Sequence, residues 1–219
     1  MADPASPAPT PIVKVPRSPL LRWFFDPVTT VVGWAVLLVF GPFRVLGRGR
    51  LPRSGGVLVV ANHRSDVDPI LIQGACRRHV HFMAKSELFE MPSIAWFMRF
   101  WGAFPVRRGE PDRTSLKLAI TLLKAGHVVC IFPEGQLSST GEMLPILPGV
   151  ALIARQAEVP LLAVGLTGAA KILPYGTLIP RPAFAWVTAR LGNPRVVSRN
   201  DSNEELTAWI DAELRRLIV

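Results

Sequence analysis

The sequence has few residues that could build a disulfide framework or a metal centre. Its 219 residues include two cysteines, Cys76 and Cys130, and four histidines, with no CxxC or HExxH spacing. A disulfide scaffold and a thiolate or histidine metal site are therefore not expected, and a reduced, cytoplasmic setting fits best. We expect neither a metal nor a cofactor.

Acidic residues are also scarce, because 16 Asp and Glu stand against 25 Lys and Arg, which gives a formal net charge of +9. Such a surplus attracts nucleic acid, an anionic bilayer or a phosphorylated substrate. The sequence lacks a zinc-finger pattern, a basic heptad helix and an aromatic RNA-binding signature, so we expect no nucleic-acid partner. One Tyr against six Trp and eleven Phe makes the aromatic set apolar, which favours a membrane surface.

The N-terminal part differs in composition from the rest of the chain. Residues 1–19 hold six prolines and no aliphatic pattern, which predicts a disordered tail. Residues 27–43 form a run of seventeen uncharged residues, followed by Arg44, Arg48, Arg50 and Arg53. We therefore expect residues 20–50 to be a membrane-associated helical segment.

This apolar run is at the lower limit for a membrane span, which needs about 20 apolar residues. A helix or helical hairpin lying in one leaflet is the preferred interpretation, and a buried core helix of a soluble protein is the alternative. If the run spans, the arginines that follow it predict a catalytic domain on the cytoplasmic side.

Beyond Arg53, short apolar runs alternate with helical patterns, as in an α/β sheet with crossover helices. We expect one domain over residues 51–219, with a mixed, largely parallel central sheet flanked by helices. A helix is predicted over Arg113 to Ala125, ending at Gly126, and the last helix opens with a Ser202–Glu205 capping box. The predicted strands are Val57 to Ala61, Val80 to Ala84, Ala103 to Val106, Val128 to Phe132, Leu161 to Leu166 and Ala185 to Leu191.

Polar side chains follow the first of these strands, in the segment VVANHRSDVDPI. Parallel sheets present ligands at the carboxyl ends of their strands. An imidazole there can take a proton from a hydroxyl, and a carboxylate on its other nitrogen holds the tautomer, so His63 and Asp68 are candidates for this pair. Asp66 could compete for the carboxylate role. A histidine beside helix-capping residues, without catalytic function, is the alternative.

The ends of other predicted strands carry charged residues and turn residues. Residues 102–109, GAFPVRRG, put Arg107 and Arg108 after a short strand, where they could hold an anion. Residues 132–135, FPEG, end another strand with Glu134 and Gly135, and residues 159–168 lead a strand into a polar turn.

In order and spacing, these blocks resemble the motifs of the glycerolipid acyltransferase family, which includes the lysophosphatidate (1-acylglycerol-3-phosphate) acyltransferases. The resemblance covers nearly the whole chain after Leu51. The matching residues are Asn62, His63, Ser65 and Asp68 for the NHxSxxD block, Gly102 to Gly109 for the second, Phe132 to Gly135 for FPEG, and the strand from Val159 for the last.

The resemblance implies a glycerol-3-phosphate acyltransferase-like fold and a direct transfer without an acyl-enzyme. His63 would remove the proton of the acceptor hydroxyl, Asp68 would orient the ring, and the thiol of CoA or acyl carrier protein would leave. Lys85 falls where the family has a lysine able to contact the acceptor phosphate. Arg108 matches the family arginine, whereas Arg107 stands at a position that is often acidic.

The remaining roles implied by the resemblance are less specific. Glu134 would contact the acceptor or brace the loop, and backbone amides after Arg107 or around Gly135 are candidates for stabilising the oxyanion. The expected partners are membrane phospholipids, a lysophospholipid acceptor and the acyl donor, acyl-CoA or acyl carrier protein. The expected location is the cytoplasmic membrane, held monotopically or by one N-terminal anchor with the catalytic domain facing the cytoplasm.

Two departures from the family pattern bear on the acceptor. FPEG commonly continues with Thr-Arg-Ser, but here Gln136, Leu137 and Ser138 follow, and a later basic residue before glycine is replaced by Pro148. A leucine cannot bind a phosphate. Lysophosphatidate is therefore ranked only narrowly ahead of another lysophospholipid such as lysophosphatidylethanolamine.

Two other classes of protein are the alternatives to an acyltransferase. One is a non-catalytic lipid-binding module of the same fold, which the presence of both His63 and Asp68 disfavours. The other is a soluble hydrolase that uses Ser65, which the absence of a GxSxG elbow disfavours.

Overall fold

The structure is a computed structural model that describes residues 31, 41–107, 112–138, 140–177, 179–182 and 185–219. Within these residues, seven strands form one sheet in the order β1-β7-β6-β2-β5-β3-β4. The strands are β1 (Phe43–Leu46), β2 (Val57–Ala61), β3 (Val80–Lys85), β4 (Phe104–Val106), β5 (Val128–Ile131), β6 (Leu161–Thr167) and β7 (Val187–Leu191). The α-helices are α2 (Asp68–Ala75), α3 (Pro92–Phe100), α4 (Arg113–Lys124), α5 (Gly149–Ala157), α6 (Ala169–Ile172) and α7 (Asn203–Leu217), and short 3-10 turns lie at η1 (Arg48–Arg50) and η2 (Ser86–Phe89).

The sheet is largely parallel, as the sequence predicts. Among the seven described strands, only β6 and β7 pair antiparallel; β2 pairs parallel with both β5 and β6, and β3 pairs parallel with β5 and β4. The carboxyl ends of β2, β3, β4, β5 and β6 therefore meet at one edge of the sheet, which we call the catalytic edge.

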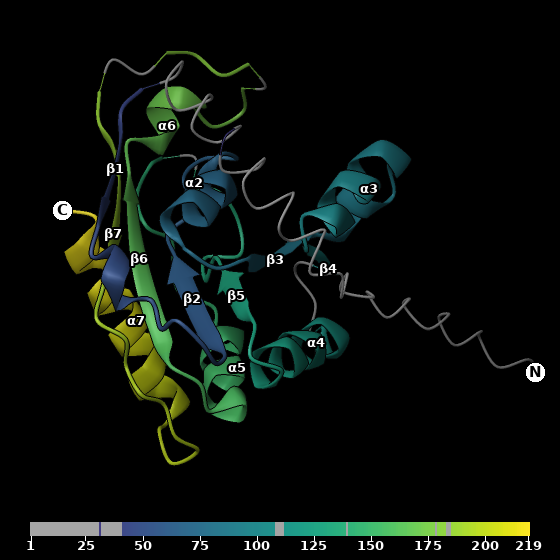
Figure 1. The fold of residues 1–219 in the computed structure, drawn as a ribbon, viewed down its shortest axis with the longest axis vertical. Helices are drawn as coiled ribbons and strands as arrows, with labels where there is room; N and C mark the ends of the chain where they lie inside the picture. Colours follow the sequence, from purple (N-terminus) through teal and green to yellow (C-terminus); the bar gives the residue numbers. More distant parts are fainter. Residues whose placement is uncertain (1–30, 32–40, 108–111, 139, 178, 183–184) are drawn as a thin grey trace, which may run out of the picture.

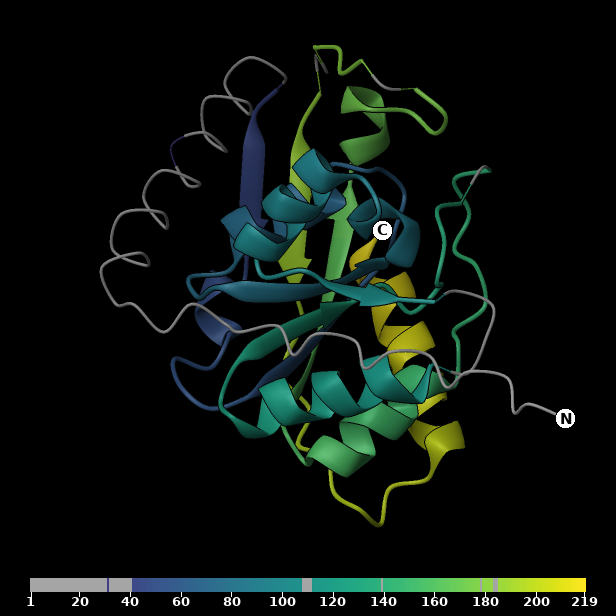
Figure 2. The ribbon, with the colours of Figure 1, turned by 90° about the vertical axis from the view of Figure 1, so that its right-hand side faces the viewer.

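Helices cover both faces of the sheet (Figures 1 and 2). All five residues of β2 are fully buried and alternate between the two faces. Val57 and Val59 pack in a core with residues of α2 and α6, whereas Leu58 and Val60 pack in a second core with residues of α4, α5 and α7. This strand is apolar throughout because both of its faces meet helices.

The expected strands agree with the structure to within two residues at each end. The helix predicted from Arg113 ends at Lys124, and Gly126 has a φ of 88°, in the left-handed region that glycine tolerates. At the start of α7, Ser202 and Glu205 form the predicted capping box.

One prediction about the N-terminal segment is wrong. Residues 43–46 were assigned to a membrane-associated helical segment, yet they form β1, which pairs parallel with β7 from Phe43↔Val187 to Leu46↔Arg190. The sheet therefore begins eight residues before the predicted domain boundary at Leu51. The cause is pairing with a strand about 140 residues away, for which the local sequence gives no signal.

The other N-terminal predictions fall outside the described residues. The predicted tail, residues 1–19, is not among the described residues. Of the apolar run over residues 27–43, the structure describes Val31 and residues 41–43. Among the residues that are described, no helix is both long and apolar enough to cross a bilayer.

Candidate active site

The catalytic edge is shaped by Asn62, the first residue after β2. Its side-chain amide donates from Nδ2 to the Leu166 carbonyl at 3.0 Å and accepts from the Leu166 N–H on Oδ1 at 2.7 Å. The fully buried amide thus continues the hydrogen-bond ladder between β2 and β6 after the β2 backbone turns away. Because both polar ends are satisfied, Asn62 fixes the position at which the next residue leaves the sheet.

His63 and Asp68, the predicted pair, lie in contact. His63 Nδ1 is 3.0 Å from Asp68 Oδ2, and the two side chains are 8% and 0% exposed. A carboxylate acceptor requires the proton on Nδ1, so Nε2 is the nitrogen that can accept a proton. The ring of His63 stacks on Phe132 with centroids 4.0 Å apart and planes at 16°. The carboxylate and the stacked ring together hold the imidazole in one orientation.

The Asp68 carboxylate sits at the amino end of α2. Its Oδ2 also accepts from the backbone N–H groups of Arg64 at 2.7 Å and Ser65 at 2.9 Å. Backbone donors and the positive end of the helix dipole favour a buried negative charge. Asp66, the competing candidate, is exposed. The geometry therefore selects Asp68 as the partner of His63.

Glu134 fastens the FPEG turn to the histidine. Its Oε1 accepts from the backbone N–H of His63 at 2.8 Å, and Oε2 accepts from the backbone N–H of Leu144 at 2.8 Å. The side chain is buried, with 4% of its surface exposed. With both oxygens engaged by backbone, the geometry favours the bracing role over contact with an acceptor.

The remaining nucleophilic side chains nearby are committed elsewhere. The Ser65 hydroxyl donates to the Leu173 carbonyl at 2.8 Å, so it holds the loop before α6. Burial raises the pKa of the Cys76 thiol to about 12 and that of Cys130 well above its ordinary value. Neither thiol is therefore a nucleophile near neutral pH. No group of three or more His, Cys, Asp or Glu in the described part of the chain is arranged to hold a metal ion.

The predicted cationic residues lie at the rim of the same edge. Lys85 ends β3 opposite Val106 of β4, and its Nζ is 3.1 Å from Glu87 Oε1, with both side chains about half exposed. Arg107 follows β4 directly and is exposed. Extending the strand registers puts Lys85 level with Asn62, two strands away, which is about 10 Å. Arg108 lies outside the described residues.

Of the amides predicted to stabilise the oxyanion, that of Gly135 is already engaged, whereas those of residues 108–111, just after Arg107, lie outside the described residues. The Gly135 N–H donates to the Phe132 carbonyl at 3.1 Å, and the Arg107 N–H donates to Asp112 Oδ2 at 3.0 Å. Gly135 has a φ of 71°, so it supports the turn by its conformation. Its contribution is thus to the shape of the loop that Glu134 holds.

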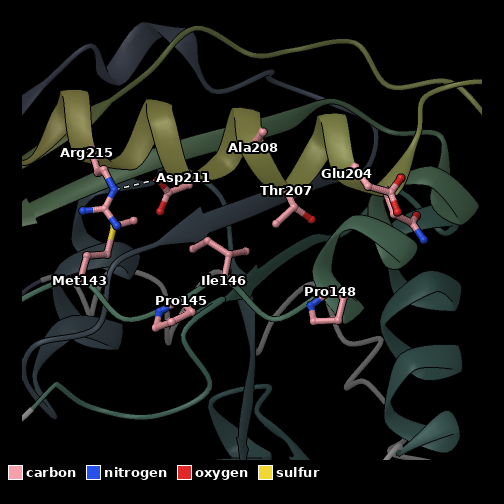
Figure 3. Close-up of a pocket in the computed structure, with 10 residues that line it drawn as sticks. Met143, Pro145, Ile146, Pro148, Glu204, Thr207, Ala208, Asp211 and Arg215 are labelled. Carbon is pink, nitrogen blue, oxygen red and sulfur yellow. Dashed lines mark hydrogen bonds and ion pairs between the residues drawn. The ribbon is translucent and has the colours of Figure 1, made fainter.

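Figure 3 shows a hollow in another part of the structure. It measures about 620 Å³ and lies between α7 and the loop 143–148, with Met143, Ile146, Asp211 and Arg215 in its lining. None of the candidate catalytic residues lines it. Its connection to the site is the Leu144 N–H bond to Glu134.

The contacts that Phe132 and Leu144 make in the site could not be predicted from the sequence. Phe132 was counted as the end of a strand, although it forms the stacking surface of His63. The second N–H group that donates to Glu134 is the backbone amide of Leu144. Every residue except proline carries such an amide, so the sequence does not indicate this contact. Only the FPEG motif, by placing Phe132 and Glu134 together, indicated that this turn matters.

Comparison with known proteins agrees with this geometry. The profile of a family described as Acyltransferase matches residues 42–167, which includes β1 and every residue of the candidate site. A 1-acyl-sn-glycerol-3-phosphate acyltransferase of Bacillus subtilis is 35% identical over 134 residues, covering 61% of this chain and 66% of that protein. A lyso-ornithine lipid O-acyltransferase of Rhodobacter capsulatus is 32% identical over 120 residues, covering 55% and 43%.

A solved structure is similar over a larger part of the chain. The 1-acyl-sn-glycerophosphate (LPA) acyltransferase PlsC of Thermotoga maritima superposes with a TM-score of 0.76 at 27% identity, covering 90% of this chain and 80% of that one. The chain spans less than two thirds of the length of each curated relative named above. The family profile covers more than half of the chain, and the protein belongs to the acyltransferase family.

Proposed function

We propose that the protein transfers a fatty acyl group from a thioester to the hydroxyl of a lysophospholipid, with 1-acylglycerol-3-phosphate as the preferred acceptor. The observation that carries the proposal is the His63–Asp68 pair at the catalytic edge, with Nδ1 engaged and Nε2 left as the base. The names of the Bacillus and Thermotoga relatives support the same reaction.

In the proposed reaction, His63 Nε2 takes the proton of the acceptor hydroxyl as its oxygen attacks the thioester carbonyl. Asp68 stabilises the imidazolium that forms, since it already accepts a bond from Nδ1. The tetrahedral intermediate then collapses, the carbon–sulfur bond breaks, and the imidazolium returns the proton to the leaving thiolate. The products are the ester and a free thiol, and no covalent enzyme intermediate is formed.

The rim cations give the acceptor phosphate a place to bind. Lys85 ends β3 and Arg107 follows the neighbouring β4, so both charges lie on the same side of the base, whose strand β2 is two strands from β3 and three from β4. A phosphate would replace the half-exposed Glu87 carboxylate on Lys85, which costs little because exposed ion pairs contribute at most about 1 kcal/mol.

A second acceptor class is favoured by one observation. Leu137 stands after FPEG where an arginine would bind phosphate, and the Rhodobacter relative is named for an ornithine lipid. We therefore retain a lysolipid without a phosphate monoester, such as lysophosphatidylethanolamine or a lyso-ornithine lipid, as the alternative acceptor.

The proposal is tested by offering palmitoyl-CoA or palmitoyl-acyl carrier protein with a panel of lysolipids and identifying the products by mass spectrometry. Phosphatidate as the main product supports the first acceptor. Turnover of another lysolipid with none of lysophosphatidate would reverse the order of the two acceptors. No transfer to any lysolipid from either donor, by protein whose folding is verified by circular dichroism, would refute the reaction.

We also propose that the protein works at a membrane surface through α3. Trp96 and Phe97 on this helix are 68% and 49% exposed, and Met91 just before it is 46% exposed. Replacing Trp96 and Phe97 by Ser should weaken binding to phospholipid vesicles, measured by flotation, by more than about tenfold, since each aromatic ring buried in the bilayer contributes about 2 kcal/mol. Deleting residues 1–40, which leaves β1 intact, tests the N-terminal segment separately. Unchanged flotation of both variants would contradict the membrane proposal.

A further inference from the structure

A row of cations runs along the outer side of α4 and continues onto α5. It consists of Arg113, Lys117 and Lys124 on α4, which are exposed, and Arg155 on α5, which is half-buried. We call these four residues the basic stripe. None of them forms an ion pair with any residue that the structure describes, and α4 contains no Asp or Glu. The stripe is therefore unneutralised positive charge.

Helix stability does not account for the stripe as a whole. Lys124 and Arg155 lie near the carboxyl ends of their helices, where a cation is favourable. Arg113, however, is the first residue of α4, at the positive end of the helix dipole, and Lys117 follows it at i+4. Both arrangements are electrostatically unfavourable. An anionic partner bound to Arg113 and Lys117 would offset this unfavourable electrostatic energy.

The far end of the stripe is concave. Lys124, Arg155, Gln156 and Arg199 line a hollow of about 450 Å³. Arg199 is already paired there with Glu158 at 2.5 Å, so the remaining free charge belongs to the stripe. An acidic group can enter this hollow and meet two cations from different helices.

The stripe starts at the catalytic edge. Asp112, the residue that caps α4, accepts from the Arg107 N–H at the end of β4 and from the Ser115 N–H. From there α4 leads away over the sheet face opposite α2, as Figure 2 shows. A molecule bound along α4 would thus have one end close to the site.

The stripe also lies away from the exposed aromatic side chains of α3. Met98 of α3 packs against the core on the α2 side of the sheet, whereas the buried residues of α4 belong to the core on the other side (Figure 2). A bilayer in contact with Trp96 and Phe97 would meet the α2 side. The basic stripe is then turned toward the aqueous phase, which favours a soluble anion.

We propose that the basic stripe is the docking surface for an acyl donor carried on a small acidic protein, an acyl carrier protein; this rests on the proposed function. Arg113 and Lys124 are eleven residues apart, which is about 16 Å along the helix. Charges at i, i+4 and i+11 face one direction and match a row of carboxylates on an acidic helix better than the clustered phosphates of one nucleotide. The thioester arm would then enter at the Arg107 end.

The test compares two donors in two charge-reversed variants. One replaces Lys117 and Lys124 by Glu, and the matched control replaces Arg77 and Lys171, exposed cations at the end of α2 and on α6, by Glu. We expect the first variant to raise KM for palmitoyl-acyl carrier protein about tenfold and to flatten its salt dependence, because rim charges act mainly on association. KM for palmitoyl-CoA should stay within twofold, and the control should keep both values.

Binding of holo-acyl carrier protein, measured by biolayer interferometry, gives a readout that does not need turnover. Loss of binding in the stripe variant but not in the control supports the docking surface even if the wild type transfers no acyl group, an outcome in which the proposed function alone fails. Three results would overturn the inference: equal loss with both donors, loss with CoA alone, or no loss with either. Reduced flotation of the stripe variant with anionic vesicles, without a donor effect, would assign the surface to the membrane instead.

Discussion

The interior and the rim of the catalytic edge differ in how their polar groups are held. In the interior, Asn62, His63, Asp68 and Glu134 are all buried, and each bonds to protein atoms at fixed positions. At the rim, Lys85 and Arg107 are exposed, and the ion pair that Lys85 forms among the described residues is with Glu87, two positions away. The interior is fixed by folding, whereas the rim is free to follow its ligand.

The interior and the rim therefore control different steps of the reaction. A proton transfer needs donor and acceptor within hydrogen-bond reach, so the base must be preorganised. Recognition of an exposed headgroup tolerates long, flexible cations, which gain little from being fixed beforehand. Substitutions in the interior should therefore affect the chemical step, and those at the rim should affect acceptor binding.

The largest effect is expected for His63→Ala. Loss of a general base lowers rates by about 10²–10⁴-fold, so kcat/KM should fall by about 10³-fold or more. Thiol release, followed with a chromogenic thiol reagent, measures the rate. The far-UV circular dichroism and the thermal midpoint of the variant check that the fold persists. A variant that retains more than a tenth of the activity would remove His63 from the chemistry.

Asp68→Asn should have the next largest effect, with Asp66→Asn as its matched control. An amide at position 68 can no longer hold a proton on Nδ1 as a charged acceptor, so kcat should fall about 10²-fold or more. Asp66 is exposed, and its replacement should leave kcat within twofold. Equal effects of the two substitutions would contradict the assignment of the carboxylate.

The interior of the site was also the part that sequence could predict. The strand before His63 is apolar throughout because it is buried on both faces, and the polar residues after it mark the end of that burial. Such a change in pattern is local and can be read without coordinates. The spacing of five residues between His63 and Asp68 then placed both at one strand-to-helix turn, where the structure brings them to 3.0 Å.

The parts that sequence could not predict depend on partners far apart in the chain. β1 could not be predicted because its four residues, FRVL, are too few to show an alternation of apolar and polar side chains, and it is a strand through its pairing with β7. The second bond of Glu134 was missed because it goes to a backbone amide. The role of the rim cations could not be predicted for another reason. Their side chains are exposed and make few contacts within the protein, so their role depends on the ligand that they bind.

Glu134→Gln probes the connection between the two regions. The carboxylate accepts two backbone N–H bonds, and an amide can accept only with its oxygen, so one buried N–H would face an NH2 group. We expect a loss of about 1–3 kcal/mol in unfolding free energy and about a tenfold drop in kcat. Glu134→Ala should be at least as destabilising. Chemical denaturation measures the stability. An unchanged midpoint together with a raised KM would favour direct acceptor contact over bracing.

Lys85→Ala should have the smallest effect, and it should act on a different kinetic parameter. Removing one exposed cation from the proposed phosphate site weakens binding by about 1 kcal/mol, so KM for lysophosphatidate should rise about fivefold while kcat stays within twofold. Lys85→Arg, which keeps the charge, should recover most of the affinity. With lysophosphatidylethanolamine as the acceptor, Lys85→Ala should raise KM less, because that headgroup carries a compensating cation. An equal loss of kcat with both acceptors would move Lys85 from the rim into the catalytic interior and erase the division between the two regions.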